Sequence, residues 1–251
     1  MGWPVVVLAG GGVGIGMGLF GVGGSSVATP VLSLLGTSGF AAVASPLPAT
    51  IPAAAVGAYA YLRSGEARPR AAAWSILGGV PGTVAGAFLS KLAGGPALLI
   101  ASGVTLVVVG VRVLRPVGEA AVEAGGRRRQ NRPLLVAASA VVGVFTGLLA
   151  NGGGFLLVPL YLLFFGLRMR QAVGTSLLVV TALSVPTLVS HWLLGHVDWA
   201  LAGEFTAGML PGAALSSRLA QRIQGARIRL AFGVFLVVFG LGFTAYRLFG
   251  P

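Results

Sequence analysis

Two glycine clusters inside long apolar runs place the strongest constraint on this chain. Asn151-Gly152-Gly153-Gly154 lies in the run 134–165, and Gly21-Val22-Gly23-Gly24 lies at the matching place in the run 3–36. Glycine weakens a helix by about 1 kcal/mol relative to alanine, so each cluster should open the helix locally. Irregular backbone at membrane depth is tolerated only inside protein or beside a polar cavity. We therefore predict that each run is a hairpin of two helices, broken at its glycines.

The composition supports burial of the chain in a lipid bilayer. Of 251 residues, 56% are hydrophobic and only 9% are charged, with a mean hydropathy of +0.93. A soluble domain carries about 25% charged residues, so this chain could not cover a water-facing surface. The net charge of +12 comes from arginines in short loops between apolar runs, where topology signals lie, and we expect no nucleic-acid partner. Without cysteine, disulfides and thiolate metal sites are excluded, and no nucleotide-binding motif appears. We expect no bound metal and no cofactor.

The apolar runs define the expected architecture, an all-α polytopic membrane protein. Most runs approach the roughly 20 residues that a helix needs to cross a bilayer. They cover residues 3–36, 40–62, 71–92, 95–114, 134–165, 172–195, 199–217 and 228–249. We predict repeat 1 at 1–116, an arginine-rich cytoplasmic linker at 117–133 and repeat 2 at 134–251. Each repeat is a glycine-broken helical hairpin followed by three transmembrane helices, and Pro46, Pro48 and Pro52 should kink the helix 40–62.

The two halves of the sequence repeat each other. At an offset of 129 residues, Gly23, Gly24 and Pro30 meet Gly152, Gly153 and Pro159. After one extra residue the offset becomes 130, at which further glycines, alanines and prolines also match. A register kept across a whole half is not expected by chance, so we infer an internal duplication.

The arginines indicate that the repeats are inverted. If each broken hairpin leaves the membrane on the side where it entered, one face keeps only Lys91 and Arg247. The other face then carries fifteen arginines, which are Arg63, Arg68, Arg70, Arg112, Arg115, Arg127, Arg128, Arg129, Arg132, Arg168, Arg170, Arg218, Arg222, Arg227 and Arg229. Basic loops mark the cytoplasmic side, so we expect both termini to be periplasmic. The rule leaves open whether each hairpin is re-entrant or spans fully.

Three motifs resemble the TauE/SafE sulfite exporter family. They are Gly21-Val22-Gly23-Gly24 followed by Pro30, the second copy Asn151-Gly152-Gly153-Gly154 followed by Pro159, and Ala172-Val173-Gly174-Thr175-Ser176-Leu177. The resemblance covers nearly the whole chain. It implies a permease of a bacterial or archaeal inner membrane that moves sulfite, a related sulfur oxyanion or an organosulfonate, usually outward. The first half departs from the pattern, because Ser25-Ser26 follows Gly24 and Ala44-Ser45-Pro46 replaces the Thr-Ser pair.

The broken helices also predict an anion site on physical grounds. The helices that begin after the glycines have N–H groups without intrahelical partners, and two such N-termini near the midplane attract an anion. The predicted substrate-binding residues supply backbone or hydrogen-bond donors, and they are Gly23, Gly24, Ser25, Ser26, Ser45, Asn151, Gly152, Gly153, Gly154, Thr175 and Ser176. We expect transport by alternating access. Glycines at GxxxG spacing, such as Gly14, Gly82 and Gly143, indicate helix packing instead.

Other functions are open at this level. His191 is a candidate carrier of a coupling proton, because ionisable residues within membrane helices are often functional. A divalent metal or other cation transporter is an alternative, although the apolar runs lack clustered Asp, Glu or His. An intramembrane hydrolase pairing Ser25 or Ser26 with His191 is a third, but the second break has no serine at that position. We favour a transporter that is not an enzyme, with a homodimer as a candidate assembly.

Overall fold

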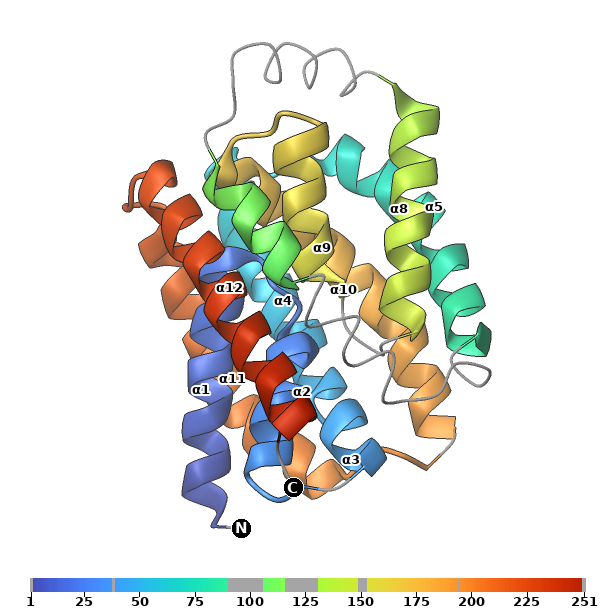
Figure 1. Ribbon diagram of the computed structural model, residues 1–251, viewed down its shortest axis with the longest axis vertical. Coiled ribbons are helices and arrows are strands. Elements are labelled where there is room, and N and C mark those ends of the chain that lie inside the picture. Colours follow the sequence, from blue (N-terminus) through green and yellow to red (C-terminus); the bar gives the residue numbers. More distant parts are fainter. Residues whose placement is uncertain are drawn as a thin grey trace.

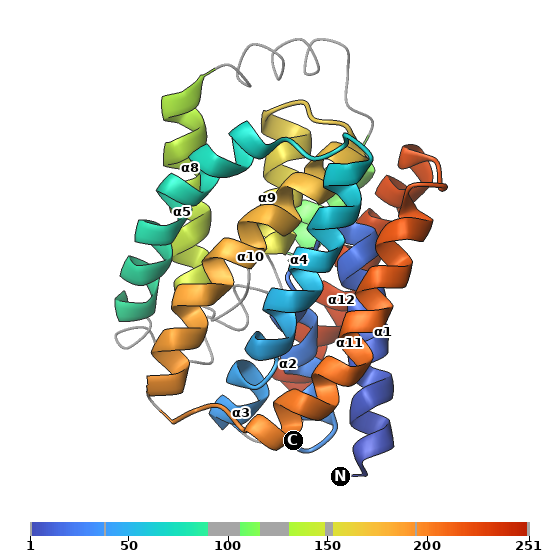
Figure 2. The same ribbon diagram turned by 180° about the vertical axis from the view of Figure 1, so that it is seen from behind.

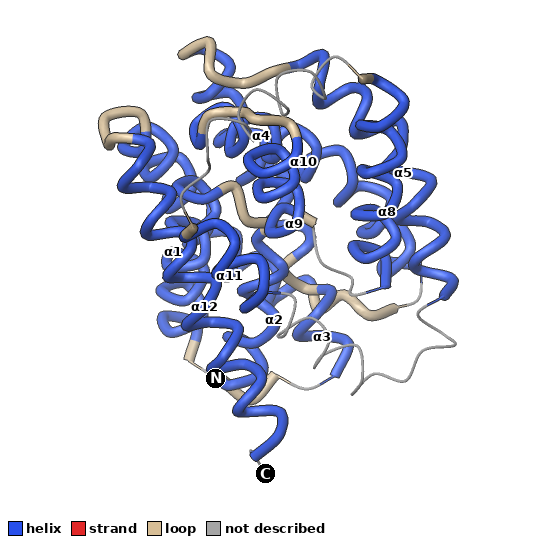
Figure 3. The backbone as a smooth tube through the Cα atoms, turned by 45° about the horizontal axis from the view of Figure 1, so that its top comes forward, coloured by secondary structure: helices blue, strands red, loops and turns tan. Residues whose placement is uncertain are grey.

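The computed structural model describes residues 2–37, 39–89, 106–115, 131–148, 153–193 and 195–249. Within these ranges the chain forms helices and loops and no strand (Figures 1 and 3). The all-α prediction is confirmed for this part of the chain. Asn151, Gly152, Lys91 and residues 117–130 of the predicted linker lie outside the described residues.

The first half begins with the predicted broken hairpin. Its helices are α1 (Trp3–Phe20), α2 (Gly24–Leu34), α3 (Gly39–Ala44), α4 (Leu47–Arg63) and α5 (Pro69–Leu89), and residues 106–114 are also helical. The predicted helix 40–62 is two helices rather than one kinked helix. Pro46 and Pro48 lie at the junction, where proline removes N–H donors and disfavours helical backbone in the preceding residue.

The second half follows the same order. Its helices are α8 (Arg132–Leu148), α9 (Gly154–Pro159), the π-helix η1 (Leu160–Phe164), α10 (Met169–Leu193), α11 (Trp199–Ala220) and α12 (Gly225–Phe249). The change from α9 to η1 occurs at Pro159, which cannot donate to the helical ladder. The other boundaries that fall among the described residues lie within a few residues of the predicted ones, whereas the start of the predicted helix 95–114 lies outside the described residues.

The two most extensive helix contacts are α1 beside α11 and α5 beside α8 (Figures 1 and 2). Glycines allow this close approach. A Cβ atom at Gly14 would lie 2.2 Å from the Met209 carbonyl oxygen, and one at Gly82 would lie 2.3 Å from that of Ala140. No side chain fits at such separations, so these glycines serve helix packing, as their spacing indicates.

Equivalent glycines make equivalent backbone contacts in the two helix pairs. A Cβ at Gly78 would meet the Val136 carbonyl oxygen at 2.1 Å, and one at Gly208 would meet that of Val7 at 1.9 Å. Gly78 and Gly208 are 130 residues apart, and Val7 and Val136 are 129 apart. The first helix of each half therefore packs against a helix of the other half. α4 and α10 contact each other between the two pairs.

Several helices are suited to cross a membrane. Among the described residues, four stretches are long and apolar enough, namely Trp3–Phe20, Ala41–Arg63, Met169–Leu193 and Gly225–Gly242. Large apolar side chains also point outward, with Leu8 76% exposed and Leu193 79% exposed. Such a surface favours lipid over water.

Charge is divided between the two ends of the molecule. The start of α1 and the end of α12 lie at one end, whereas α4 and α11 finish, and α5, α8, α10 and α12 begin, at the other (Figures 1 and 2). We call the second end the basic end, because its helix termini and loops carry Arg63, Arg68, Arg70, Arg112, Arg115, Arg132, Arg168, Arg170, Arg218, Arg222, Arg227 and Arg229.

Candidate substrate site

Both predicted glycine breaks are formed. α1 ends at Gly21, which has a left-handed φ of 68°, and α2 starts after Gly23. In the second half, Gly153 has the same φ of 68° and precedes the first residue of α9. Glycine adopts this conformation without the strain that a Cβ atom brings, so these residues allow the chain to stop and restart a helix.

The two breaks lie directly against each other. A Cβ atom at Gly154 would lie 2.2 Å from the Gly23 nitrogen and 2.4 Å from the Gly21 carbonyl oxygen. Any side chain at residue 154 would push the breaks apart. The start of α9 thus rests on the backbone that leads into α2.

Ser176 joins the two breaks from α10. Its buried Oγ donates to the Gly21 carbonyl at 3.0 Å and lies 3.5 Å from the Gly154 carbonyl oxygen. These carbonyls belong to different halves of the chain. Through these two contacts, Ser176 links the first break to the second.

Ser25 and Ser26 lie in the first turn of α2, beside the first break. Ser25 is fully buried, and the backbone N–H of Ser26 donates to the Gly23 carbonyl at 3.0 Å. The Ser26 Oγ is buried and has no hydrogen-bond partner. A buried hydroxyl without a partner is costly, and a polar ligand could satisfy it.

Thr175 and Ser45 have other partners. The Thr175 Oγ1 donates to the Gln171 carbonyl at 2.6 Å and accepts from the Arg68 N–H at 3.1 Å. The Ser45 Oγ accepts from the Asp198 N–H at 3.1 Å. These hydroxyls anchor the loops before α5 and α11, and the structure does not show either one at the breaks.

Two side chains that the sequence reasoning missed lie over the breaks. A Cβ at Gly24 would meet the Met209 methyl at 1.9 Å, so Met209 covers the start of α2. A Cβ at Gly153 would meet the Thr146 Oγ1 at 2.3 Å. The residue equivalent to Thr146 at offset 129 is Met17, and at the first break a Cβ at Gly24 would lie 3.0 Å from the Thr50 Oγ1.

Backbone groups and hydroxyls dominate the interior of the described structure. The buried polar side chains there are serines, threonines and Gln171, and no charged side chain is fully buried. Any charge bound near the breaks would therefore be stabilised by helix N-termini and hydroxyls rather than by an ion pair.

His191 lies near the end of α10 and not at the breaks. Its Nδ1 is 3.3 Å from the Nδ1 of His196, next to the edge-to-face pair of Trp192 and Trp199. The Ser26 Oγ makes no hydrogen bond, so the Ser26–His191 pair that a hydrolase would need is not formed.

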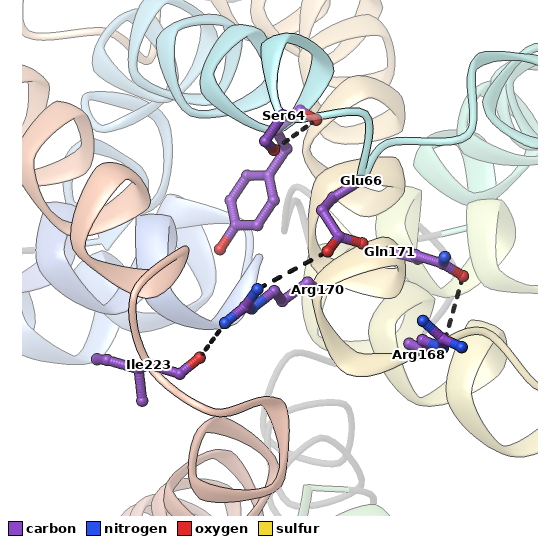
Figure 4. A network of polar contacts seen from close by, with 7 residues as sticks. Ser64, Glu66, Arg168, Arg170, Gln171 and Ile223 are labelled. Atoms are coloured by element: carbon purple, nitrogen blue, oxygen red, sulfur yellow. Dashed lines mark hydrogen bonds and ion pairs between the residues drawn. The ribbon is translucent and has the colours of Figure 1, made fainter.

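A polar network joins three loops at the basic end (Figure 4). Arg170 Nη1 lies 3.8 Å from Glu66 Oε1, and Arg170 Nη2 donates to the Ile223 carbonyl at 2.5 Å. The Arg168 N–H donates to Gln171 Oε1 at 3.4 Å. These contacts tie the α4–α5, η1–α10 and α11–α12 connections together.

Long apolar helices combined with two contacting helix breaks define a class of protein, the polytopic membrane transporters. A model of the family described as Sulfite exporter TauE/SafE matches residues 6–243. The chain therefore belongs to the TauE/SafE sulfite exporter family, whose members are membrane transporters and generally not enzymes.

Curated relatives agree with this assignment. The chain is 31% identical to a probable membrane transporter protein of Xylella fastidiosa (strain 9a5c) over 242 residues, covering 93% of this chain and 91% of the relative. It is 26% identical to the probable membrane transporter protein YunE of Bacillus subtilis (strain 168), covering 88% and 90%. A shorter match, 31% identical over 42% of each chain, is a probable membrane transporter protein of Methanocaldococcus jannaschii. No solved structure matches significantly.

Proposed function

We propose that this protein is a permease for a small oxyanion, with sulfite, a related sulfur oxyanion or an organosulfonate as substrate. The anion binds where the N-termini of α2 and α9 meet, and it is exported across the inner membrane. The observation that carries the proposal is the direct contact between the two left-handed glycine breaks, at Gly21–Gly24 and Gly153–Gly154.

The site favours negative charge through its backbone. The first N–H groups of a helix have no intrahelical acceptors, and a helix N-terminus carries about half a positive charge. Because Gly154 has no side chain, the start of α9 packs directly on the backbone at Gly21 and Gly23, which brings the two N-termini together. Ser26, whose Oγ has no hydrogen-bond partner in the described structure, adds a hydroxyl donor beside the first break. A divalent cation would instead need clustered carboxylates or histidines.

Inverted repeats provide a route to alternating access. The equivalent helices α1 and α8 run in opposite directions, as do α4 and α10 (Figures 1 and 2). The repeated glycine contacts of the α1–α11 and α5–α8 pairs support a two-fold relation between the halves. We infer that one half rocks against the other around the breaks, opening the site to each side in turn. His191 is our candidate for a coupling proton.

The Ser176 hydroxyl offers a direct test of the site. Ser176→Ala removes the donor that joins Gly21 to the second break, which should lower the free energy of unfolding by about 1 kcal/mol. Because the breaks lose their common anchor, we expect sulfite flux into proteoliposomes to fall at least tenfold.

Ser64→Ala is the matched control, since its hydroxyl bonds only to the nearby Tyr61 carbonyl at the protein surface. Flux should be measured with sulfite, sulfate, an organosulfonate and Ni²⁺. Unchanged sulfite flux in Ser176→Ala would refute the site. Transport of Ni²⁺ but of no oxyanion would favour the cation alternative.

A further inference from the structure

A cavity of about 880 Å³ opens at the basic end, between the first turns of α5 and α8. Its wall includes Arg68, Arg70, Arg132, Trp74 and Leu135. The cavity is separate from the glycine breaks, and the transport proposal above assigns no role to it.

Two helix N-termini add to the positive charge of this cavity. Gly78 packs on Val136 and Gly82 on Ala140, a constant step of 58 residues, so α5 and α8 run parallel and α8 begins opposite Trp74, just after the first turn of α5. Neither helix has an acidic residue in its first turn, where one would offset the positive end of the helix dipole. Arg70 and Arg132 occupy those turns instead.

The described structure supplies no carboxylate to balance this charge. No acidic residue is found among the described residues of the wall, and the nearby Glu66 is paired with Arg170. The Arg68 Nε is buried and has no hydrogen-bond partner. Arg132 stacks over the Trp74 ring, with its Cζ 5.5 Å from the ring centroid, which holds its guanidinium at the wall.

At the opposite end of the molecule, a carboxylate occupies the position equivalent to Arg68 and caps the helix that follows. The residue equivalent to Arg68 at offset 130 is Asp198, whose carboxylate accepts from the N–H groups of Ala200 and Leu201 at 3.0 and 3.1 Å. That carboxylate caps α11, the helix equivalent to α5. At the basic end, Arg68 stands at the position equivalent to Asp198. The start of α8 is capped by the neutral Asn131 side chain, whose Oδ1 accepts from the Leu134 N–H.

We propose that this cavity binds a phosphate group, donated by the headgroup of an anionic phospholipid or by a free phosphate. Arginine side chains present forked N–H donors that fit phosphate oxygens, and basic pockets between membrane helices bind anionic headgroups. Leu77 and Leu134 are exposed on α5 and α8, within one turn of the cavity residues Trp74 and Leu135, and offer an apolar surface for acyl chains, so the lipid source should bind more tightly.

The test uses the purified protein in detergent, with thermal unfolding measured at fixed ionic strength. Phosphatidylglycerol, phosphatidylcholine and inorganic phosphate are added separately. Phosphatidylglycerol should raise the unfolding temperature more than phosphatidylcholine does. In Arg70→Gln/Arg132→Gln, its apparent affinity should fall on the order of fivefold per arginine removed.

Arg222→Gln/Arg227→Gln is the matched control, because it removes the same charge from exposed positions at the same end and should keep the response. An arginine-dependent response to phosphatidylglycerol alone identifies a lipid headgroup, and one to inorganic phosphate alone identifies a soluble ligand. The proposal is overturned if neither compound stabilises the protein, or if both double variants lose the response equally.

Discussion

Single residues make the two glycine breaks unequal. A Cβ at Gly24 would meet both the Met209 methyl and the Thr50 Oγ1, whereas one at the equivalent Gly153 would meet the Thr146 side chain alone among its nearest atoms. The position equivalent to Met209 is Gly79, so the second break also lacks the thioether that covers the first. We therefore expect substitutions at Gly153 to affect a bound oxyanion more than substitutions at Gly24.

Gly153→Ala tests the contact with Thr146. An alanine at φ 68° is strained by roughly 1–2 kcal/mol, and its Cβ would also collide with the Thr146 Oγ1 at 2.3 Å. Gly195→Ala is the matched control, because Gly195 has φ 70° but open space around it. Gly153→Ala should unfold at a lower temperature than Gly195→Ala and lose sulfite flux.

Adding Thr146→Ala should recover part of the stability of Gly153→Ala, since it removes the Oγ1 from the collision. Thermal unfolding of the wild type, Gly153→Ala, Thr146→Ala and the double variant completes the cycle. Equal unfolding temperatures for Gly153→Ala and Gly195→Ala would contradict the contact.

At the scale of helices, the parallel pairs α1–α11 and α5–α8 hold the two halves together. Their backbones approach so closely at glycines that a Cβ atom would meet a carbonyl oxygen of the facing helix. In lipid, such packing replaces the hydrophobic effect as the force that joins helices. A methyl group at these positions must therefore separate the pair.

Gly82→Ala and its equivalent Gly212→Ala test this packing. Their Cβ atoms would lie 2.3 Å from the Ala140 and 2.5 Å from the Gly11 carbonyl oxygens, and such overpacking costs about 1–3 kcal/mol. Gly203→Ala on α11 has no atom within 4 Å and should be neutral or stabilising, because alanine favours helix. Unfolding in detergent measures all three, and equal stability of Gly82→Ala and Gly203→Ala would contradict the packing role.

At the scale of the whole molecule, charge separates the two ends. Apart from Arg247 near the end of α12, the described arginines gather at the basic end, whereas Asp198 lies at the turn before α11, at the end where the chain termini lie. Arginine-rich loops are retained in the cytoplasm. We therefore propose that the basic end is cytoplasmic and that both termini are periplasmic.

Single cysteines in this cysteine-free chain test the orientation. Gly2 and Ser64 are both exposed. Gly2 precedes α1 at the end where the chain termini lie, and Ser64 follows α4 at the basic end. In intact cells, a membrane-impermeant maleimide should label Gly2→Cys, and it should label Ser64→Cys only after permeabilisation. The reverse pattern would show that the basic end faces outward.

Helix positions were largely predictable, because apolar runs must form helices in lipid and glycine clusters must interrupt them. The breaks at Gly21–Gly23 and Gly153 were predicted for this reason, as was the repeat of Gly14 at Gly143 in packing. The split between α3 and α4 was not predicted, since a proline pair such as Pro46 and Pro48 can either bend or end a helix. Local sequence does not decide between these outcomes.

The sequence by itself determined the class of protein, the breaks and the duplication, because each depends on local composition or on a register along the chain. Only the tertiary structure decided which side chains reach the breaks. Adjacent residues on a helix point about 100° apart, so Ser176 reaches Gly21 while Thr175 bonds to Arg68. The cavity of Arg68 and Arg132 likewise depends on α5 and α8 lying in parallel, a contact between segments far apart in the chain.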